Sequence, residues 1–338
     1  MKKVLVGMSG GVDSSVCALL LKEQGYDVCG VTLTLYKNSA SDAKAVCDKM
    51  GILHKTIDFS ELFERTVIKE FTSAYIAGKT PNPCVTCNKL IKFGAMAEQA
   101  EKDGFDFIAT GHYAKIEEKN GEYFVQKADN EEKDQSYVLY NMTQKLLSHT
   151  LFPLATLSKP QIRQIAEDNG LITANKPDSQ DICFVPDGNY ASFIKNVTDF
   201  IPPCGNFVDM SGNIIGKHEG IIKYTIGQRN GLGFGFGKRR YVISKNSQTN
   251  DIVLGDNEDL FKTKLIATDY NFISGKIPQD PLRVSAKTRY KQRQTPATIT
   301  VNGDFITVEF DEPQRAVTPG QSVVFYDDKT LLGGGIIL

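Results

Sequence analysis

Two stretches of the sequence combine residue types that can carry out chemistry. The first is a turn near the start of the chain, Gly7-Met8-Ser9-Gly10-Gly11-Val12-Asp13-Ser14. Its glycines let backbone N–H groups approach phosphate oxygens closely, and its serine hydroxyls add further hydrogen bonds. A carboxylate beside a phosphate needs a cation between them, so we expect Asp13 to be a ligand of Mg²⁺. The turn is therefore predicted to bind the phosphates of a nucleotide.

This turn differs from two better-known phosphate-binding loops. It has neither the spacing nor the lysine of a Walker A loop, and it does not match the GxGxxG pattern of dinucleotide-binding folds. The alternative is a turn that merely starts a helix. The apolar strand before it and the amphipathic helix after it favour the nucleotide site.

The second stretch is Cys84-Val85-Thr86-Cys87, which follows two prolines and opens a helix. A cysteine at a helix N-terminus is expected to have a lowered pKa, which favours the nucleophilic thiolate. A third cysteine, Cys183, lies far along the chain in a polar stretch. Three interpretations remain open: a redox or sulfur-transfer pair, an iron–sulfur cluster held by three thiolates, or structural zinc with a fourth ligand.

The other bulk features favour a soluble, cytoplasmic protein. Cys17, Cys29 and Cys47 lie in apolar patterns typical of small buried side chains, and an odd total of seven argues against a disulfide framework. The formal net charge is −1, so any RNA binding must come from local basic patches. We see no signal peptide and no apolar run long enough to span a bilayer, and expect a cytoplasmic protein without a membrane partner.

The residues of both stretches must be positioned by an alternating series of strands and helices. We expect strands over residues 4–6, 28–35, 54–59 and 105–109, and helices over residues 12–24, 41–50, 61–76 and 89–102. This order predicts an α/β domain with a doubly wound, Rossmann-like parallel sheet. Ligands bind such sheets beyond the carboxyl ends of the strands, where the turn at 7–15 and Gly111 should meet. His112, beside Gly111, is expected to make structural hydrogen bonds.

Three domains are predicted: a catalytic domain over residues 1–199, a small glycine-rich central domain over 200–258 and a C-terminal antiparallel β-barrel over 259–338. Strands of the barrel are expected over residues 265–273, 282–290, 297–301, 305–310, 322–326 and 331–338. Asn120-Gly121 predicts a tight hairpin inside the first domain. Ser158-Lys159-Pro160-Gln161 predicts a capped helix start.

Together, several long motifs resemble those of the bacterial tRNA-specific 2-thiouridylases, a family of PP-loop ATP pyrophosphatases. They are GMSGGVDSS, TPNPCVTCNKLIKFG, ATGHYA, KDQSYVLY, SQDICF, YTIGQRNGLG, KTRY and the closing GGGIIL, and they span nearly the whole chain. The resemblance implies a PP-loop domain, a small central domain and a C-terminal β-barrel. It also implies that ATP adenylates the C2 oxygen of the wobble uridine of tRNA. Sulfur then replaces that oxygen, arriving as a persulfide through sulfur-relay proteins from a cysteine desulfurase.

The resemblance assigns roles by position. Cys87 matches the family's nucleophile, and Cys183 matches the cysteine that carries the persulfide and forms a disulfide with Cys87 during turnover. The nucleotide-binding positions are Gly7 to Ser14, Leu33 and Gly111. Asn82, Pro83 and Cys84 match the stretch against the target base, and Lys133, Asp134, Gln135, Arg289 and Tyr290 match tRNA-contacting stretches.

One position departs from the family pattern. Many members have Asp where this chain has Cys84, and that carboxylate is thought to act as an acid or base. Cys84 also completes a three-cysteine set with Cys87 and Cys183, as in relatives proposed to use a [4Fe–4S] cluster. We favour the persulfide route over the cluster route. The rival functions are another PP-loop adenylating enzyme and an RNA-binding protein that only senses a nucleotide.

A basic stretch close to the end of the chain offers a phosphate contact. Lys287, Arg289, Lys291 and Arg293 alternate with other residues, which would place all four on one face of a strand. Each such cation would steepen the salt dependence of tRNA binding. The alternative is an ordinary solvated face.

Overall fold

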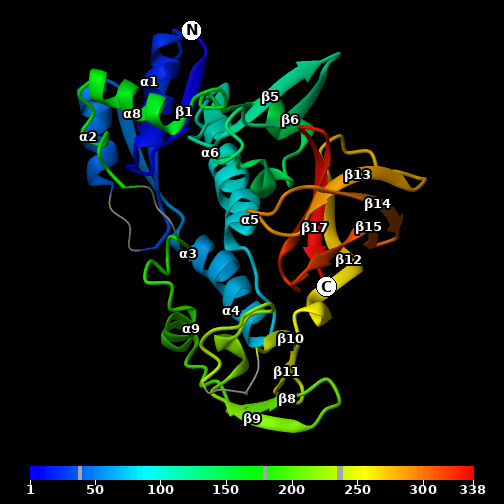
Figure 1. The fold of residues 1–338 in the computed structure, drawn as a ribbon. Coiled ribbons are helices and arrows are strands. Elements are labelled where there is room, and N and C mark those ends of the chain that lie inside the picture. Colours follow the sequence, from blue (N-terminus) through cyan, green and yellow to red (C-terminus); the bar gives the residue numbers. More distant parts are fainter. Residues whose placement is uncertain (37–39, 178–180, 234–238) are drawn as a thin grey trace.

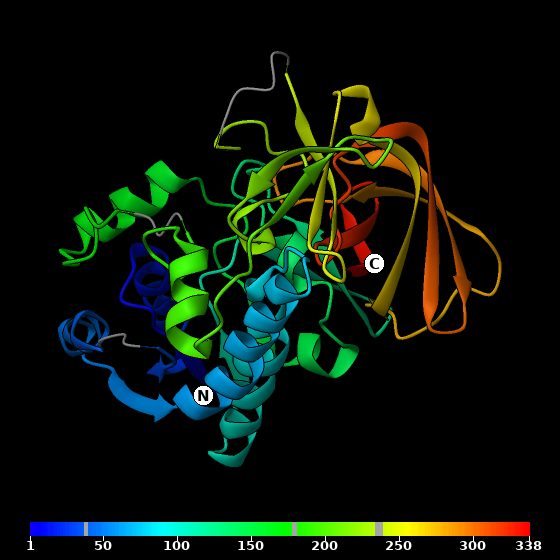
Figure 2. The same cartoon turned by 90° about the horizontal axis from the view of Figure 1, so that it is seen from below.

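A computed structural model describes residues 1–36, 40–177, 181–233 and 239–338. Asp178, Ser179 and Gln180, which precede Cys183 in its motif, lie outside the described residues. Three bodies can be followed in Figures 1 and 2: a parallel-sheet body, a small sheet and a barrel that contains the C-terminus. Within the described ranges no helix is both long and apolar enough to cross a membrane.

The first body contains the predicted parallel sheet. Its strand order is β3-β2-β1-β4-β7, with every neighbouring pair parallel. The strands are β1 (Lys3–Gly7), β2 (Asp27–Thr34), β3 (Leu53–Asp58), β4 (Phe107–Ala109) and β7 (Thr150–Leu151). The order places β1 at the centre of the sheet, so the turn after it opens in the middle of the carboxyl edge.

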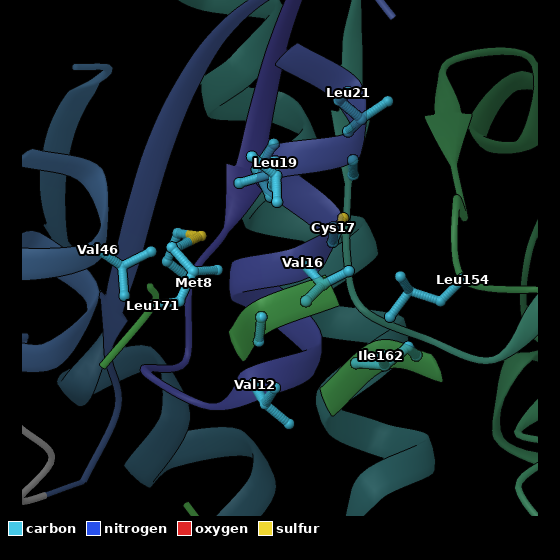
Figure 3. Packing of buried hydrophobic residues seen from close by; sticks show 14 of the residues in the cluster. Met8, Val12, Val16, Cys17, Leu19, Leu21, Val46, Leu154, Ile162 and Leu171 are labelled. Atoms are coloured by element: carbon cyan, nitrogen blue, oxygen red, sulfur yellow. The ribbon is translucent and has the colours of Figure 1, made fainter. Parts of the chain in front are cut away.

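Helices cover both faces of this sheet, which confirms the doubly wound prediction. On one face, α1 (Val12–Glu23), α2 (Ser41–Met50) and α8 (Lys159–Asp168) share a core with Val4 and Val6. Figure 3 shows Val16, Val46 and Ile162, one from each of these helices, in that core. On the other face, Leu5 packs against the helical segment that contains Phe93 and Met96. Successive residues of a strand point to opposite faces, which is why Val4, Leu5 and Val6 divide between two cores.

Two long helical segments connect the bodies. The first comprises α3 (Ser60–Phe63), η1 (Glu64–Ile68) and α4 (Lys69–Ile76), and the second comprises α5 (Pro83–Cys87), η2 (Asn88–Ala95) and α6 (Met96–Lys102). Both η1 and η2 are π-helical. The second segment begins at Pro83 rather than at residue 89 as predicted, because the side chain of Asn82 accepts from the Cys84 N–H and Pro83 fits the first turn. Cys84 and Cys87 therefore lie on the helix itself.

The small central body packs against α4. Its sheet order is β10-β11-β8-β9, with β8 (Gly205–Val208), β9 (Ile214–His218), β10 (Tyr241–Asn246) and β11 (Asp251–Gly255). Phe71 of α4 shares a hydrophobic core with Phe207, Ile221 and Val242 of this body. The neighbouring helices are α9 (Tyr190–Thr198), η4 (Ile221–Lys223) and η5 (Glu258–Leu260).

The C-terminal strands form the predicted antiparallel barrel. They are β12 (Phe261–Phe272), β13 (Leu282–Lys287), β14 (Thr295–Asn302), β15 (Phe305–Arg315), β16 (Ser322–Asp327) and β17 (Thr330–Ile337). The long strand β12 bends and pairs with both β15 and β17, which closes the barrel. A closed barrel leaves few unpaired strand edges.

A hairpin from the first domain extends this barrel sheet. Strands β5 (Ala114–Lys119) and β6 (Glu122–Lys127) meet at the predicted Asn120-Gly121 turn, and β6 pairs with β17. The chain then runs through η3 (Ser136–Leu139) and α7 (Gln144–Ser148) back to the parallel sheet. The hairpin therefore ties the nucleotide-binding body to the barrel.

The basic strand face predicted for residues 287–293 is wrong. Strand β13 ends at Lys287, whose ammonium lies 5.9 Å from the ring centres of both Tyr137 and Tyr326. Arg289 turns inward and donates to the backbone carbonyls of Ile226 and Ala316. A turn closed by the Gln292 N–H and the Arg289 carbonyl breaks the strand, so the alternation does not continue. Only Lys291 and Arg293 of the four remain exposed.

Candidate active site

The turn after β1 has the shape expected of a phosphate site. Gly10 has φ +73°, a left-handed backbone conformation that glycine adopts without steric cost. The hydroxyls of Ser9 and Ser14 lie 3.2 Å apart, and the Ser14 hydroxyl donates to the Gly11 carbonyl. The first helical bond of α1 runs from the Ser15 N–H to the Gly11 carbonyl, so the N–H groups before it have no carbonyl one turn earlier. They are available to an anion.

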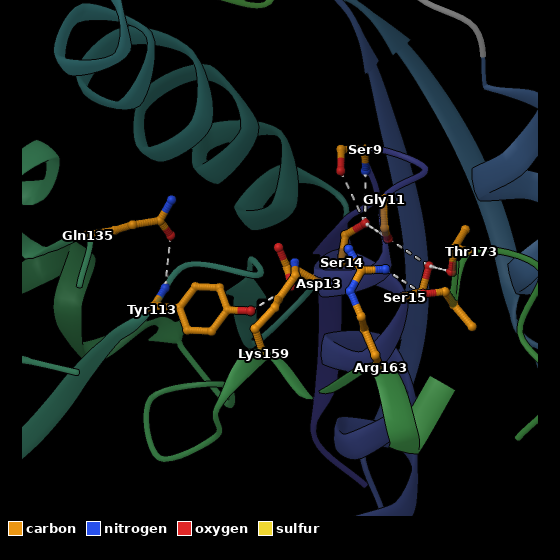
Figure 4. Close-up of polar contacts among 11 residues, drawn as sticks. Ser9, Gly11, Asp13, Ser14, Ser15, Tyr113, Gln135, Lys159, Arg163 and Thr173 are labelled. Carbon is orange, nitrogen blue, oxygen red and sulfur yellow. Dashed lines mark hydrogen bonds and ion pairs between the residues drawn. The ribbon is translucent and has the colours of Figure 1, made fainter. Parts of the chain in front are cut away.

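Asp13 is held by two groups from distant parts of the chain (Figure 4). Its Oδ1 accepts from the Tyr113 hydroxyl at 2.6 Å and from the Lys159 ammonium at 2.7 Å. Tyr113 follows β4 and is buried, whereas Lys159 is the first residue of α8. The Lys159 ammonium therefore places a positive charge beside the Asp13 carboxylate, which we predicted to require a cation.

Gly111 and Leu33 lie at the same edge of the sheet. A Cβ atom on Gly111 would come within 2.9 Å of the carbonyl carbon of Asp13 and 3.0 Å of the Ser14 nitrogen. Leu33 lies one residue before the end of β2, the strand beside β1. Gly111 therefore borders the turn, whereas Leu33 lies two residues beyond Val31, whose carbonyl accepts from the Met8 N–H, and its contact with the nucleotide stays a prediction.

A later segment also rests on the turn. The Lys176 ammonium donates to the Gly10 carbonyl at 2.8 Å and to Asp42 at 2.7 Å. The Thr173 hydroxyl donates to the Ser15 hydroxyl at 3.0 Å (Figure 4). Lys176 therefore bonds the turn to α2, seven residues before Cys183 in the sequence.

The three predicted cysteines are brought into one electrostatic neighbourhood. Negative charge on Cys183 or on Cys84 raises the pKa of Cys87, and negative charge on Cys84 raises that of Cys183. Cys87 is buried, Cys84 and Cys183 are exposed, and all three are free thiols. The fold thus brings Cys183 to the helix that carries the CxxC pair.

The predicted lowering of the thiol pKa at the helix start is wrong. Burial raises the pKa of Cys87 to about 11, and desolvation by the surrounding protein also raises the pKa of Cys84, even though Cys84 is an exposed residue. A thiolate loses its hydration when it is enclosed, and here that loss outweighs the attraction of the helix N-terminus. Cys87 is consequently protonated at neutral pH.

Lys92 opposes this effect. Its positive charge lowers the pKa of Cys84, Cys87 and Cys183 alike. Replacing Lys92 by methionine should therefore raise the Cys87 pKa further above 11 and reduce its thiolate fraction at pH 8. We expect alkylation of Cys87 by iodoacetamide to slow roughly three- to tenfold, as loss of one nearby opposite charge predicts.

The rate is measured by peptide mass spectrometry between pH 7 and pH 10, where it should climb steadily with pH because the thiol remains mostly protonated. Lys89→Met is the matched control: Lys89 lies on the same helical segment but pairs with Asp269 at 3.0 Å. Equal alkylation rates in Lys92→Met and the unaltered protein would contradict the assignment.

An iron–sulfur site is not preformed. Within the described ranges no three Cys, His, Asp or Glu side chains are gathered so that they could hold a metal ion. Cys84, Cys87 and Cys183 are neighbours but are not arranged as a ligand set. We therefore derive no step through a cluster.

Comparisons with known proteins cover the chain from end to end. Family models match residues 2–187 ("tRNA methyl transferase HUP domain"), 191–256 ("tRNA methyl transferase PRC-barrel domain") and 262–337 ("Aminomethyltransferase beta-barrel domain"). The tRNA-specific 2-thiouridylase MnmA of Clostridioides difficile (strain 630) is 52% identical, covering 99% of this chain and 98% of that relative. Its counterpart in Clostridium acetobutylicum is 48% identical, with 99% of each chain covered. The chain belongs to the tRNA-specific 2-thiouridylase family.

Two solved structures share part of the fold. A 4-thiouridine synthetase–RNA complex with bound ATP matches 59% of this 2-thiouridylase chain and 50% of its own, at 12% identity and a TM-score of 0.37. An NMN synthetase from Francisella tularensis matches 59% of this chain and 77% of its own, at 15% identity and a TM-score of 0.33. These TM-scores are too low to bear on function.

The positions expected to contact tRNA in this 2-thiouridylase differ in exposure. Asp134 is buried and accepts from the N–H groups of Ala128 and Ser136, so its carboxylate stabilises the loop. The Gln135 side chain accepts from the Tyr113 N–H at 3.0 Å. Lys133 is partly exposed. Contact of tRNA with Lys133 and Gln135, the two of the three that are not buried, stays a prediction.

Tyr290 reaches the cysteine region from the barrel. Burial, Asp134 and Cys84 together raise its pKa to about 12, and the ring packs against a core that includes Val85, which follows Cys84 on the helix. Its ring packs edge-on against Tyr137 at 5.9 Å. Arg289, by contrast, is engaged with the backbone. The barrel therefore contributes Tyr290 to the wall of the cysteine site.

Four polar residues of the 2-thiouridylase site were not assigned from the sequence: Lys92, Tyr113, Lys159 and Lys176. Tyr113 and Lys159 appeared only within a strand-end motif and a capping box, and nothing local connected either to Asp13. The sequence indicated only that Tyr113 follows a strand and that Lys159 begins a helix, and such positions often border a ligand site. His112 agrees with its predicted structural role, since it is buried, 2.7 Å from the Thr110 hydroxyl, and desolvation holds its pKa well below the usual value.

Proposed function

We propose that the protein catalyses ATP-dependent 2-thiolation of the wobble uridine of tRNA. The observation that carries the proposal is that Cys183 lies close enough to the CxxC helix to interact electrostatically with Cys84 and Cys87, while its neighbour Phe184 shares a hydrophobic core with Cys87. Relatives named tRNA-specific 2-thiouridylase match the chain over 99% of its length. The proposal also includes domain limits at residues 199 and 258. It further includes a cytoplasmic location, where ATP, tRNA and reduced thiols occur together.

In the first step, the C2 oxygen of uridine attacks the α-phosphorus of ATP. A bond from O2 to phosphorus forms, the bond to the β-phosphate bridging oxygen breaks, pyrophosphate leaves and the N3 proton is lost to solvent. The free N–H groups at the start of α1 and the serine hydroxyls of the turn bind the charged oxygens. The uridine oxygen, otherwise a poor leaving group, becomes part of AMP.

Mg²⁺ fits this site through Asp13. Magnesium in nucleotide sites is commonly held by one or two carboxylates together with phosphate oxygens. Asp13 is one such carboxylate, at the helix start where the phosphates are expected. When bound, the ion would neutralise charge on the pyrophosphate.

In the second step, sulfur replaces the activated oxygen. A donor persulfide first transfers its outer sulfur to Cys183, leaving the donor as a thiol. The outer sulfur of Cys183–S–SH attacks C2, and AMP departs with the oxygen. Cys87, which is protonated in the resting protein, then loses its proton to solvent and attacks the inner sulfur, so that 2-thiouridine is released and a Cys87–Cys183 disulfide forms. A thiol reductant, itself oxidised, restores both cysteines. The donor is a sulfur-relay protein or a cysteine desulfurase.

The test is to incubate the protein with unmodified tRNA, ATP, Mg²⁺ and a persulfide donor, then digest the tRNA and analyse nucleosides by mass spectrometry. We expect 2-thiouridine, with AMP and pyrophosphate formed in equal amounts, and none without ATP. Binding of tRNA without ATP turnover would favour a nucleotide sensor. The reaction is run with aerobically prepared protein and with protein reconstituted anaerobically with an iron–sulfur cluster. If neither preparation forms 2-thiouridine, the proposal is contradicted.

A further inference from the structure

Lys287 is a buried lysine without a partner of opposite charge. It is the last residue of β13 and only 8% exposed, and its ammonium lies 5.9 Å from the ring centres of both Tyr137 and Tyr326. Among the described residues, none forms a hydrogen bond or an ion pair with this ammonium. Aromatic faces attract a cation, but they do not replace the acceptors that its three N–H groups require. Burial therefore lowers the pKa of Lys287.

The Lys287 ammonium is nevertheless open to solvent. Three buried side-chain atoms in the described part of the chain lack a hydrogen-bond partner, and they are Thr80 Oγ1, Asn88 Oδ1 and Arg289 Nε. The Lys287 nitrogen also lacks a partner but is not among these enclosed atoms, so it reaches the surface. An anion from outside the protein can therefore bind it.

The nearest carboxylate does not neutralise Lys287 by direct contact. Asp134 attracts the ammonium and raises the pKa of Lys287, and the exposed Glu131 does so more weakly. The oxygens of Asp134, however, accept from the N–H groups of Ala128 and Ser136 and from the Ser136 hydroxyl. Asp134 therefore holds its own loop together, and it favours a positive charge at Lys287 without occupying the ammonium's donors.

A second lysine lies against the same aromatic ring. The ammonium of Lys127, at the end of β6, lies 5.2 Å from the ring centre of Tyr326. Its charge repels that of Lys287 and lowers the pKa of Lys287. Lys127 is half-buried, and within the described ranges its ammonium likewise has neither an ion-pair partner nor a hydrogen-bond acceptor. Two like charges gathered at one ring destabilise each other, and an anion that binds both relieves this repulsion.

The two lysines lie close to the start of the cysteine helix. Tyr290 packs edge-on against Tyr137, whose ring centre is 5.9 Å from the Lys287 ammonium, and joins the core that contains Val85. Negative charge on Cys84 raises the pKa of Tyr290, as does Asp134, which also attracts Lys287. Lys287 is therefore linked through two aromatic residues to the helix start, where we expect the target base.

We propose that Lys287 and Lys127 together bind a backbone phosphate of tRNA next to the uridine that is modified. The inference rests on the proposed 2-thiolation of tRNA. A phosphodiester has two unbridged oxygens that share one negative charge, so each oxygen can accept from one ammonium. Phosphate contacts fix the position of a nucleic acid on a protein, and this one would set the target uridine against the cysteine helix.

This contact differs from the one expected of an exposed basic strand. It depends on two ammonium groups held by aromatic rings rather than on a row of solvated cations. Partial burial of Lys287 leaves less water to compete with the phosphate, which strengthens the charge-assisted bond.

Binding of an anticodon stem–loop RNA to the full chain tests the proposal. Dissociation constants are measured by fluorescence anisotropy over a range of KCl concentrations for Lys287→Met, Lys127→Met and the double variant, with melting temperature as a check on folding. Each single substitution should weaken binding roughly three- to tenfold, as expected for loss of one charge-assisted hydrogen bond. The double variant should reduce the slope of log Kd against log [KCl] by about 0.7, the value for one phosphate contact with a single strand. ATP affinity should not change.

Two further RNAs locate the phosphate. Each carries an uncharged methylphosphonate in place of one of the phosphates that flank the target uridine. On one of them, Lys287→Met and Lys127→Met should bind as tightly as the unaltered protein, because the charge that the lysines contact is already gone. Lys264→Met is the matched control, since Lys264 is an exposed barrel lysine that pairs with Glu309 at 2.8 Å. It should change neither the affinity nor the slope.

The inference is overturned if both single variants bind the unaltered RNA as tightly as the original protein. It is also overturned if they lose the same affinity for all three RNAs, because the lysines then contact neither flanking phosphate. If Lys287→Met does not fold, Lys127→Met decides the question, because Lys127 is only half-buried. Failure of the original protein to bind the unaltered RNA would instead overturn the proposed function, so the two failures are distinguishable.

Discussion

Replacing Cys87 by serine is expected to abolish release of 2-thiouridine while AMP is still formed. Adenylation needs only the nucleotide turn, and the persulfide on Cys183 can still attack C2. The inner S–S bond then has no thiolate to cleave it. In the absence of added thiol, turnover should fall by about three orders of magnitude, as is usual when a nucleophile is removed. Nucleoside mass spectrometry after one round of reaction measures the product.

This variant should also accumulate a covalent intermediate. The uridine stays joined to Cys183 through a disulfide, which appears as a protein–tRNA adduct on a denaturing gel. Added dithiothreitol should release 2-thiouridine from it, because an external thiol replaces the missing Cys87. Cys183→Ser should form neither adduct nor product.

Cys204→Ser is the control, because Cys204 is exposed but belongs to the loop before β8. It should be as active as the unaltered protein. Full activity of Cys87→Ser without thiol would contradict the disulfide step and favour a PP-loop enzyme that does not use these cysteines.

The nucleotide turn could be predicted from the sequence because its residues are contiguous. Glycines, serines and a helix start within eight positions specify both the backbone shape and the hydrogen-bond donors. The parallel sheet could also be predicted, since β1 and β2 are short apolar runs joined by the amphipathic helix α1. Both features depend on local patterns.

The groups around Asp13 could not be predicted in this way. Tyr113 and Lys159 are 100 and 146 residues from Asp13 in the chain. They meet it only because β4 lies beside β1 and α8 packs on α1. The pairing of β6 with β17 could not be predicted either, because nothing in the hairpin sequence indicates which distant strand it pairs with.

Two predictions were wrong because burial outweighed a local sequence pattern. The helix-start rule predicted an acidic Cys87, but enclosure of the thiol raises its pKa to about 11. The alternation rule predicted an exposed basic strand, but Lys287 is only 8% exposed and lies over aromatic rings. The helix start and the alternation of basic residues are both present in the sequence. The exposure of each side chain to solvent, however, is determined by the tertiary structure.

Replacing Gly111 by alanine is expected to weaken ATP binding by roughly ten- to a hundredfold, the range that follows from about 1–3 kcal/mol of overpacking. The added Cβ would lie 2.9 Å from the Asp13 carbonyl carbon and 3.0 Å from the Ser14 nitrogen, and these atoms belong to backbone rather than to a flexible side chain. The start of α1 must therefore shift. Its N–H groups and the Asp13 carboxylate would no longer be aligned on the phosphates.

Titration calorimetry with ATP measures the effect, and the melting temperature reports any general loss of stability. Gly275→Ala is the control: Gly275 has φ +70° and no atom within 4 Å of an added Cβ, in the barrel. That substitution should cost stability through backbone strain, by about 1 kcal/mol, yet bind ATP as the unaltered protein does. If Gly111→Ala binds ATP within twofold of normal, the close approach of Gly111 to the turn has no part in nucleotide binding. If it loses ATP but keeps its melting temperature, the tight contact is what aligns the phosphate site.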